Sequence, residues 1–170
     1  MLIIFSGLSG TGKTTIAREL AREIGAVYVR VDSIEQALRD AGSLTHPMDD
    51  AGYRIGHAVA EDNLRLGRTV IADCVNPLDI TRSTWRAVAD SAGVRAVEIE
   101  VICSDAKEHR RRVETRVSDV PGLRLPTWEE VVAREYHAWA REHLTIDTAL
   151  CNVQQSVRLI RKLLNNKPNI

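Results

Sequence analysis

The sequence predicts an α/β fold in which a parallel β-sheet lies between two layers of helices. Short apolar segments alternate along the chain with longer segments whose apolar residues recur at helical spacing, a pattern typical of strands joined by crossover helices. The first apolar segment also runs directly into a glycine-rich turn that opens a helix. The chain has 170 residues, no internal repeat and no long linker, so we expect one domain over residues 1–170.

The expected elements follow from this alternation. The expected strands cover residues 1–5, 26–31, 69–73, 95–103 and 144–146. The expected helices cover residues 15–24, 33–41, 50–66, 79–92, 105–116, 128–141 and 153–164. Asp32 and Ser33 are the expected caps of the second helix, and a capping box at residues 127–130 opens the sixth. We also expect a loop at residues 43–47 and an irregular tail at residues 165–170.

The amino-acid composition reduces the number of function classes that this chain can belong to. Hydrophobic residues at 44% and charged residues at 27% are typical of a soluble globular protein. Lys plus Arg number 23 and so do Asp plus Glu, and this zero net charge speaks against a broad nucleic-acid-binding face. The cysteines and histidines show no zinc-ligand spacing. The opening apolar run is too short for a signal peptide, and no stretch reaches membrane-spanning length, so we expect a cytoplasmic protein.

The glycine-rich turn at residues 7–14 fits the pattern G-x-x-x-x-G-K-[ST] at every fixed position. Glycines let the backbone curl so that its N–H groups point inward and cradle phosphate oxygens. The motif predicts that Lys13 reaches the β- and γ-phosphates and that Thr14 holds Mg²⁺. No N/T-K-x-D guanine signature occurs, so we expect ATP. The residues expected to bind it are Gly7, Ser9, Gly10, Thr11, Gly12, Lys13, Thr14 and Thr15. The alternative is a glycine-rich turn before an ordinary helix.

Two aspartates, Asp32 and Asp73, follow the second and third expected strands, at the edge where open α/β sheets bind ligands. Asp32 could bind the substrate and accept a proton from its hydroxyl, or it could only cap a helix. Asp73 could bind Mg²⁺ through water, bind substrate, or only bond to nearby backbone. The sequence leaves open which of the two is the base. No glutamate follows Asp73, and this favours transfer to a bound hydroxyl over ATP hydrolysis.

The arginine-rich helix at residues 107–116 is the third candidate. Arg112 and Arg116 are four residues apart and share a helical face. A loop with two prolines and a glycine follows, so we expect a lid at about residues 105–126 in which these two arginines stabilise the transferred phosphoryl. Which of them contacts the phosphates is open, and a solvated charged helix is the alternative. Tyr53 and Arg54 lie near the start of the third expected helix, which is expected to face the acceptor site, with a surface position as the alternative. Of the two, Arg54 is the expected substrate-binding residue.

Together these motifs resemble the small P-loop kinases, a group often described as AAA-family ATPases. The loop Gly7–Thr14 is similar to that of adenylylsulfate and gluconate kinases. The layout of Asp32, Val70–Asp73 and the lid arginines resembles zeta-toxin, chloramphenicol phosphotransferase and polynucleotide kinase-like proteins. The resemblance implies a three-layer α/β/α P-loop NTPase fold with strand order 2-3-1-4-5 and a short helical lid, MgATP as cofactor, and Asp32 as the base. Val31-Asp32-Ser33 departs from the Asp-Gly-Asp of adenylylsulfate kinases, so the resemblance implies no particular substrate.

The expected function is therefore that of an ATP-dependent phosphotransferase that moves the γ-phosphate to a hydroxyl of a small-molecule acceptor. The alternatives are a polynucleotide 5′-hydroxyl kinase and a non-enzymatic ATP-binding regulator. The sequence assigns neither the acceptor nor an oligomeric state.

Overall fold

The computed structural model describes residues 1–43 and 50–165. It is built around a five-stranded sheet. β1 (Leu2–Ser6) is the central strand, between β3 (Val70–Asp73) and β4 (Ala96–Ile102), and β2 (Val27–Arg30) and β5 (Leu144–Asp147) form the edges. All four pairings are parallel, and the order β2-β3-β1-β4-β5 confirms the expected topology.

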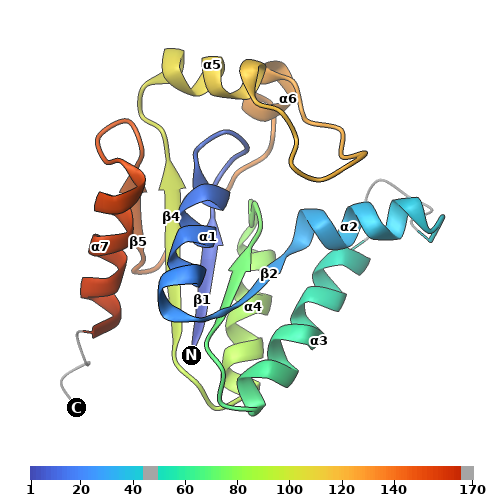
Figure 1. Cartoon of the computed structure of the whole chain (residues 1–170), viewed down its shortest axis with the longest axis vertical. Coiled ribbons are helices and arrows are strands. Elements are labelled where there is room, and N and C mark those ends of the chain that lie inside the picture. Colours follow the sequence, from blue (N-terminus) through green and yellow to red (C-terminus); the bar gives the residue numbers. More distant parts are fainter. Residues whose placement is uncertain (44–49, 166–170) are drawn as a thin grey trace.

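Helices cover both faces of this sheet, as the alternating pattern predicted. α1 (Lys13–Ile24) and α7 (Val153–Asn165) pack on one face, and α3 (Ala51–Arg65) and α4 (Asp79–Ser91) pack on the other (Figure 1). Successive strand residues point to opposite faces. Ile3 and Phe5 of β1 therefore join the core beneath α1 and α7, while Leu2 and Ile4 join the core beneath α3 and α4. Both faces of β1 are buried, which fixes its position at the centre of the sheet.

The remaining helices lie at the carboxyl ends of the strands. α5 (Ala106–Thr115) and α6 (Trp128–Val132) cross above the sheet, and α2 (Val31–Asp40) packs against α3 beside it (Figure 1). None of the helices in the described part of the chain has both the length and the apolar character needed to cross a membrane. The loop expected at residues 43–47 falls, from residue 44 on, outside the described residues, as do residues 166–170 of the expected tail.

The junction of β2 and α2 differs from the sequence prediction. The chain passes from strand to helix without a loop, and the N-cap is Arg30 rather than Asp32 or Ser33. Asp32 therefore lies in the first turn of α2, and the side chain of the N-cap residue makes no capping hydrogen bond. Val31 is 2% exposed and belongs to the core beneath α3 and α4, so its burial accounts for a helix start earlier than the capping residues indicated.

The helix predicted at residues 128–141 was also wrong in length, because α6 ends at Val132. Its capping box is present as expected, with Thr127 and Glu130 bonding each other's backbone N–H groups. Beyond it the chain has no regular secondary structure up to β5, and Tyr136 and Trp139 lie against the fully buried guanidinium of Arg82, 4.9 and 4.3 Å from the ring centroids. These contacts with α4 override the local helical tendency.

Candidate active site

The loop between β1 and α1 has the shape that its glycines predicted. Gly7 and Gly10 adopt φ values of +140° and +85°, in the region that disfavours side chains. A Cβ atom on Gly7 would lie 2.2 Å from the carbonyl oxygen of Val101, and one on Gly10 would lie 2.5 Å from Cγ2 of Val113. Glycine is thus required both for the curl of the loop and for its close packing under β4 and α5.

A buried ion pair links this loop to β3. Lys13 Nζ donates to Asp73 Oδ1 at 2.6 Å, and both side chains are under 10% exposed. The hydroxyl of Tyr28, on β2, donates to Asp73 Oδ2 at 2.5 Å. Burial disfavours the charged form of both side chains, but the charge of each partner outweighs this effect. Asp73 raises the pKa of Lys13, and the charge and hydrogen bond of Lys13 lower the pKa of Asp73. The pair is therefore ionised at neutral pH.

The residues expected to hold Mg²⁺ fit that ion. Thr14 lies close enough to Asp73 to help lower the pKa of its carboxyl, after the larger effects of Lys13 and Tyr28, so a hydroxyl and a carboxylate are neighbours here. Mg²⁺ prefers such oxygen ligands and typically binds one or two carboxylates plus substrate phosphates and water. Within the described residues, no cluster of three or more His, Cys, Asp or Glu side chains could hold a metal ion, so an Mg²⁺ ion here would rely on the phosphates.

A cavity of about 230 Å³ opens over the glycine-rich loop. Five of the side chains that the sequence singled out as catalytic or metal-binding line it together: Lys13, Thr14, Asp32, Arg112 and Arg116. Ser9, Gly10, Gly12 and Thr15 also line it. Gly7 and Thr11 are buried and do not, because Gly7 packs against Val101 and the Thr11 hydroxyl bonds the carbonyl of Leu8.

This phosphate cavity, as we call it, lies between two larger ones of about 590 Å³ each. The first shares Gly12, Thr15 and Arg112 with it and extends along residues 148–153 to the start of α7. The second shares Asp32 and Arg116 with it and extends under α2 and the chain between α5 and α6. We call these the α7 cavity and the α2 cavity. The three together form a continuous row across the carboxyl edge of the sheet.

Arg112 and Arg116 occupy the two junctions of this row. Arg112 donates to Glu108 Oε1 at 2.8 Å and to Thr148 Oγ1 at 2.8 Å, which fixes its guanidinium between the phosphate and α7 cavities. Arg116 is half-buried between the phosphate and α2 cavities, and its Nε has no hydrogen-bond partner in the described residues. Burial lowers the pKa of Arg116, although the nearby Asp32 favours its charge. Arg116 is a cation placed to receive an anionic ligand.

Not every expected residue joins the site. Arg54 is exposed on α3 and lines none of these three cavities, whereas its neighbour Tyr53 lines the α2 cavity. Asp73 lies behind the phosphate cavity, where it holds Lys13. Sequence reasoning missed Arg30, Arg134 and Thr148. Arg30 was within reach of the rule that strand ends carry the site, because it is the last residue of β2.

The fold is shared with known kinases. A model of the AAA_33 family, described as an AAA domain, matches residues 2–135. The APS kinase of Mycobacterium tuberculosis, solved with AMPPNP and APS, superposes with a TM-score of 0.75 at 20% identity over 97% of each chain. A sugar kinase from a Janibacter species gives 0.70 at 19% identity, covering 98% of this chain and 95% of its own.

A third similar structure is that of Chaetomium thermophilum Kti12 in complex with ADP-AlF3. Its TM-score is 0.71 at 21% identity, and the match covers 97% of this chain and 98% of that chain. No curated protein matches the sequence. At these identities the structural matches establish the fold, which is that of P-loop kinases.

Proposed function

The chain belongs to the AAA_33 family, and from this membership and the geometry of its site we propose that it is an ATP-dependent phosphotransferase acting on a hydroxyl of a small molecule. The observation that carries the proposal is the row of three cavities. The α7 cavity would hold the nucleoside, the phosphate cavity the triphosphate, and the α2 cavity the acceptor. Asp32 and Arg116 line both the second and the third, where the phosphoryl group would cross.

In the transfer step, the acceptor oxygen forms a bond to the γ-phosphorus while the bond from that phosphorus to the β,γ-bridging oxygen breaks. Asp32 accepts the proton of the hydroxyl, and ADP leaves with the bridging oxygen. Phosphoryl transfer requires mostly positioning and positive charge. Lys13 and Arg112 stabilise negative charge on the phosphates of the nucleotide, and Arg116 stabilises negative charge on the phosphoryl group during its transfer. Mg²⁺ held by the Thr14 hydroxyl, and by Asp73 through water, would neutralise charge on the β- and γ-phosphates.

Asp32 suits this role because it is not tied into the core. Its side chain is 37% exposed and lies 3.6 Å from Arg30, which is itself held by Asp119 at 2.9 Å. A carboxylate in such a position can approach a bound hydroxyl, whereas Asp73 is fixed by Lys13 and Tyr28. We therefore assign the base to Asp32 rather than to Asp73.

The test is a coupled ADP-release assay with MgATP and a panel of sugars, nucleosides, antibiotics and oligonucleotides. We expect one class of small molecule to stimulate ADP release. With that acceptor, Asp32→Asn should lower kcat by a factor of about 100 or more. Asp62→Asn, an exposed aspartate on α3, is the matched control and should leave kcat unchanged.

Three results would overturn the proposal. Asp32→Asn turning over at the parent rate would remove the assigned base. Stimulation by 5′-hydroxyl oligonucleotides alone would identify a polynucleotide kinase. Tight ATP binding with no transfer to any acceptor would favour a regulatory ATP-binding protein.

A further inference from the structure

The α2 cavity is unusually rich in arginine. Its lining includes Arg30, Arg39, Arg116, Arg124 and Arg134, which come from β2, α2 and the chain on both sides of α6. The same lining contains three carboxylates, Asp32, Glu35 and Glu130. A pocket that bound only a neutral polyol would have no use for this excess of guanidinium groups, because hydroxyls are recognised equally well by uncharged donors.

The carboxylates account for only some of these arginines. Glu35 pairs with Arg39 at 3.3 Å, and Glu130 pairs with Arg124 at 2.6 Å. Arg30 lies between Asp32 and Asp119. Within the described residues, the side chains of Arg116 and Arg134 make no hydrogen bond or close ion pair, so these two cations lack a direct partner. Asp32 lies near Arg116, and Glu35 and Glu130 act on the exposed Arg134 only at longer range.

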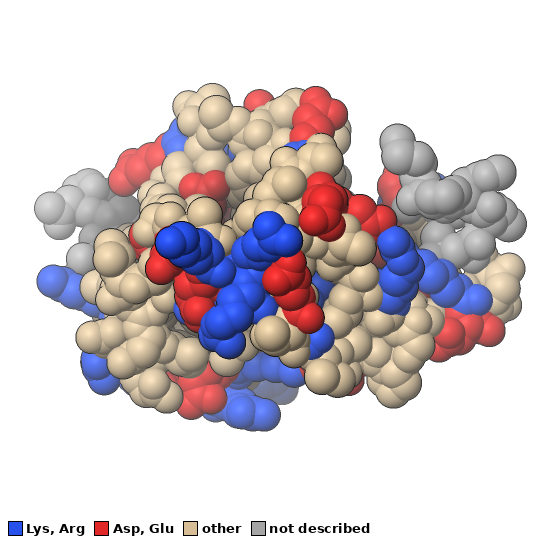
Figure 2. All heavy atoms as spheres, turned by 90° about the horizontal axis from the view of Figure 1, so that it is seen from above, with Lys and Arg blue, Asp and Glu red and all other residues tan. Residues whose placement is uncertain are grey.

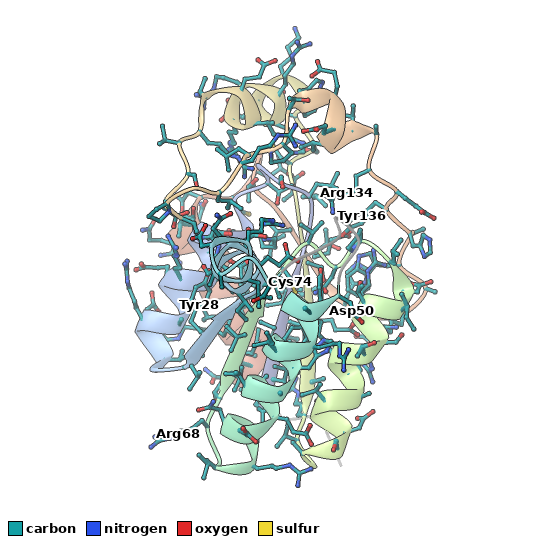
Figure 3. The ribbon with its side chains drawn as sticks, turned by 90° about the vertical axis from the view of Figure 1, so that its right-hand side faces the viewer. Tyr28, Asp50, Arg68, Cys74, Arg134 and Tyr136 are labelled. Carbon is teal, nitrogen blue, oxygen red and sulfur yellow. The ribbon has the colours of Figure 1, made fainter. Side chains whose placement is uncertain are left out.

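The two unpaired arginines have different surroundings. Arg116 also lines the phosphate cavity, so the transferred phosphoryl would pair with it. Arg134 lines the α2 cavity alone, and it lies between the layer of α5 and α6 and the carboxyl ends of the strands (Figure 3). The phosphates of ATP therefore leave Arg134 without a partner.

We propose that the acceptor carries, besides its reacting hydroxyl, an anionic group (a phosphate, sulfate or carboxylate) that Arg134 binds. Arg39 and Arg124 line the same cavity on exposed side chains and can add a second contact. A guanidinium fork is suited to such planar or tetrahedral anions because it donates two parallel hydrogen bonds. That the anion is part of the phosphoryl acceptor rests on the proposed function, whereas the presence of an anion site at Arg134 does not.

The size and charge of the molecule favour a small ligand over a nucleic acid. A volume of about 590 Å³ is within the usual range of small-molecule pockets. The face above α5 and α6 shows basic and acidic side chains interspersed rather than a continuous basic track (Figure 2), and the net charge is zero. A polynucleotide would require such a track along its backbone.

Binding of simple anions tests the site without turnover. With saturating Mg-AMPPNP in the donor site, inorganic phosphate and sulfate are titrated by calorimetry. We expect Arg134→Gln to weaken anion binding about tenfold, the loss expected for one charge-assisted contact, with unchanged affinity for AMPPNP. Arg68→Gln is the matched control, because Arg68 is exposed at the opposite end of the sheet (Figure 3), and it should bind anions like the parent.

Paired acceptors test the substrate class. Glucose is compared with glucose 6-phosphate, and glycerol with glycerate, so that the phosphate and carboxylate cases are separated. We expect the anionic member of at least one pair to have the higher kcat/KM, and Arg134→Gln to remove that advantage through KM.

The outcomes separate this inference from the proposed function. Arg134-dependent anion binding without any phosphotransfer would support the anion site and contradict the kinase. Transfer to a neutral acceptor, with anion binding equal in Arg134→Gln and Arg68→Gln, would overturn the anion site and leave the kinase standing. Arg134-dependent binding of a single-stranded oligonucleotide, tighter than that of phosphate, would overturn the small-molecule class.

Discussion

Lys13 and Asp73 neutralise each other inside the protein before any nucleotide arrives. The pair is embedded between the glycine-rich loop and β3, and Tyr28 supplies a further hydrogen bond from β2. A buried charge whose partner is removed is costly, so these residues have a structural role as well as their proposed role in binding. The two roles can be separated by mutation.

We expect Lys13→Met to lower the free energy of unfolding by about 3–5 kcal/mol, because Asp73 is left buried without its cation. It should also abolish measurable ATP binding. The double variant Lys13→Met/Asp73→Asn should recover most of the stability without recovering ATP binding. Urea unfolding and nucleotide titration measure the two effects, and a single variant as stable as the parent would contradict this account.

The hydrogen bond from Tyr28 should affect how the free energy of unfolding falls at low pH. The pKa of Asp73 is lowered on folding, and a carboxyl of this kind stabilises the protein above its ordinary pKa and loses that contribution as the pH falls. Tyr28→Phe removes one of the bonds that lower this pKa. We expect it to cost about 1 kcal/mol at neutral pH and to move acid unfolding to a higher pH. Tyr53→Phe is the control, because the Tyr53 hydroxyl bonds a backbone N–H; equal acid profiles for the two variants would refute the prediction.

At the scale of elements, α5 is the part of the fold that closes the site from above. Two contacts hold it there: His109 Nε2 donates to the carbonyl of Ser9 at 2.8 Å, and Arg112 bonds Thr148. Thr148 in turn donates to the carbonyl of Thr11 at 2.7 Å. The glycine-rich loop and α5 are therefore packed as one unit.

Gly10→Ala tests this packing. The new methyl group would meet Val113 of α5 at 2.5 Å, on a backbone with φ of +85°, so we expect a loss of about 1–3 kcal/mol in unfolding free energy and weaker nucleotide binding. Adding Val113→Ala should relieve the contact but not the backbone strain, and so recover only part of the loss. Gly25→Ala is the control for strain alone, because it has φ of +63° with nothing within 4 Å of a Cβ.

The elements differ in how far sequence could predict them. The glycine-rich loop was predictable because each fixed residue meets a local requirement of backbone or ligand. The end of α6 was not, because residues 133–141 have helical composition and their irregular path depends on distant Arg82 and Glu98. The early start of α2 depends in the same way on the burial of Val31.

At the scale of the whole molecule, the site is a row of cavities across the carboxyl edge of the sheet. The phosphate cavity could be expected from one motif, the glycine-rich loop, whereas the α2 cavity is lined from β2, α2, α3 and the chain around α6. Such a convergence of remote segments leaves no local signal for Arg134, or for the choice between Tyr53 and Arg54. Arg30, by contrast, could have been found from its place at the end of β2.

Ligand-induced stabilisation tests the donor half of the row. Mg-AMPPNP at about 100 times its Kd should raise the free energy of unfolding by about 2.7 kcal/mol. Removing magnesium with EDTA should reduce this gain, and Thr14→Val should make the gain insensitive to magnesium. Thr84→Val, on the exposed face of α4, is the matched control and should keep the parent's response; a response retained by Thr14→Val would argue against its oxygen as a ligand.

The last turn of α5 fixes the distance between the side chains of Arg112 and Arg116. One helical turn rises about 5.4 Å, and the two guanidinium groups enter successive cavities from its two ends. The exposed side chains of Glu114 and Thr115 can be replaced without altering that spacing. Inserting a single residue between them would turn Arg116 by about 100° away from the phosphates. In the proposed reaction, the length of this turn, more than its composition, would set the separation of donor and acceptor.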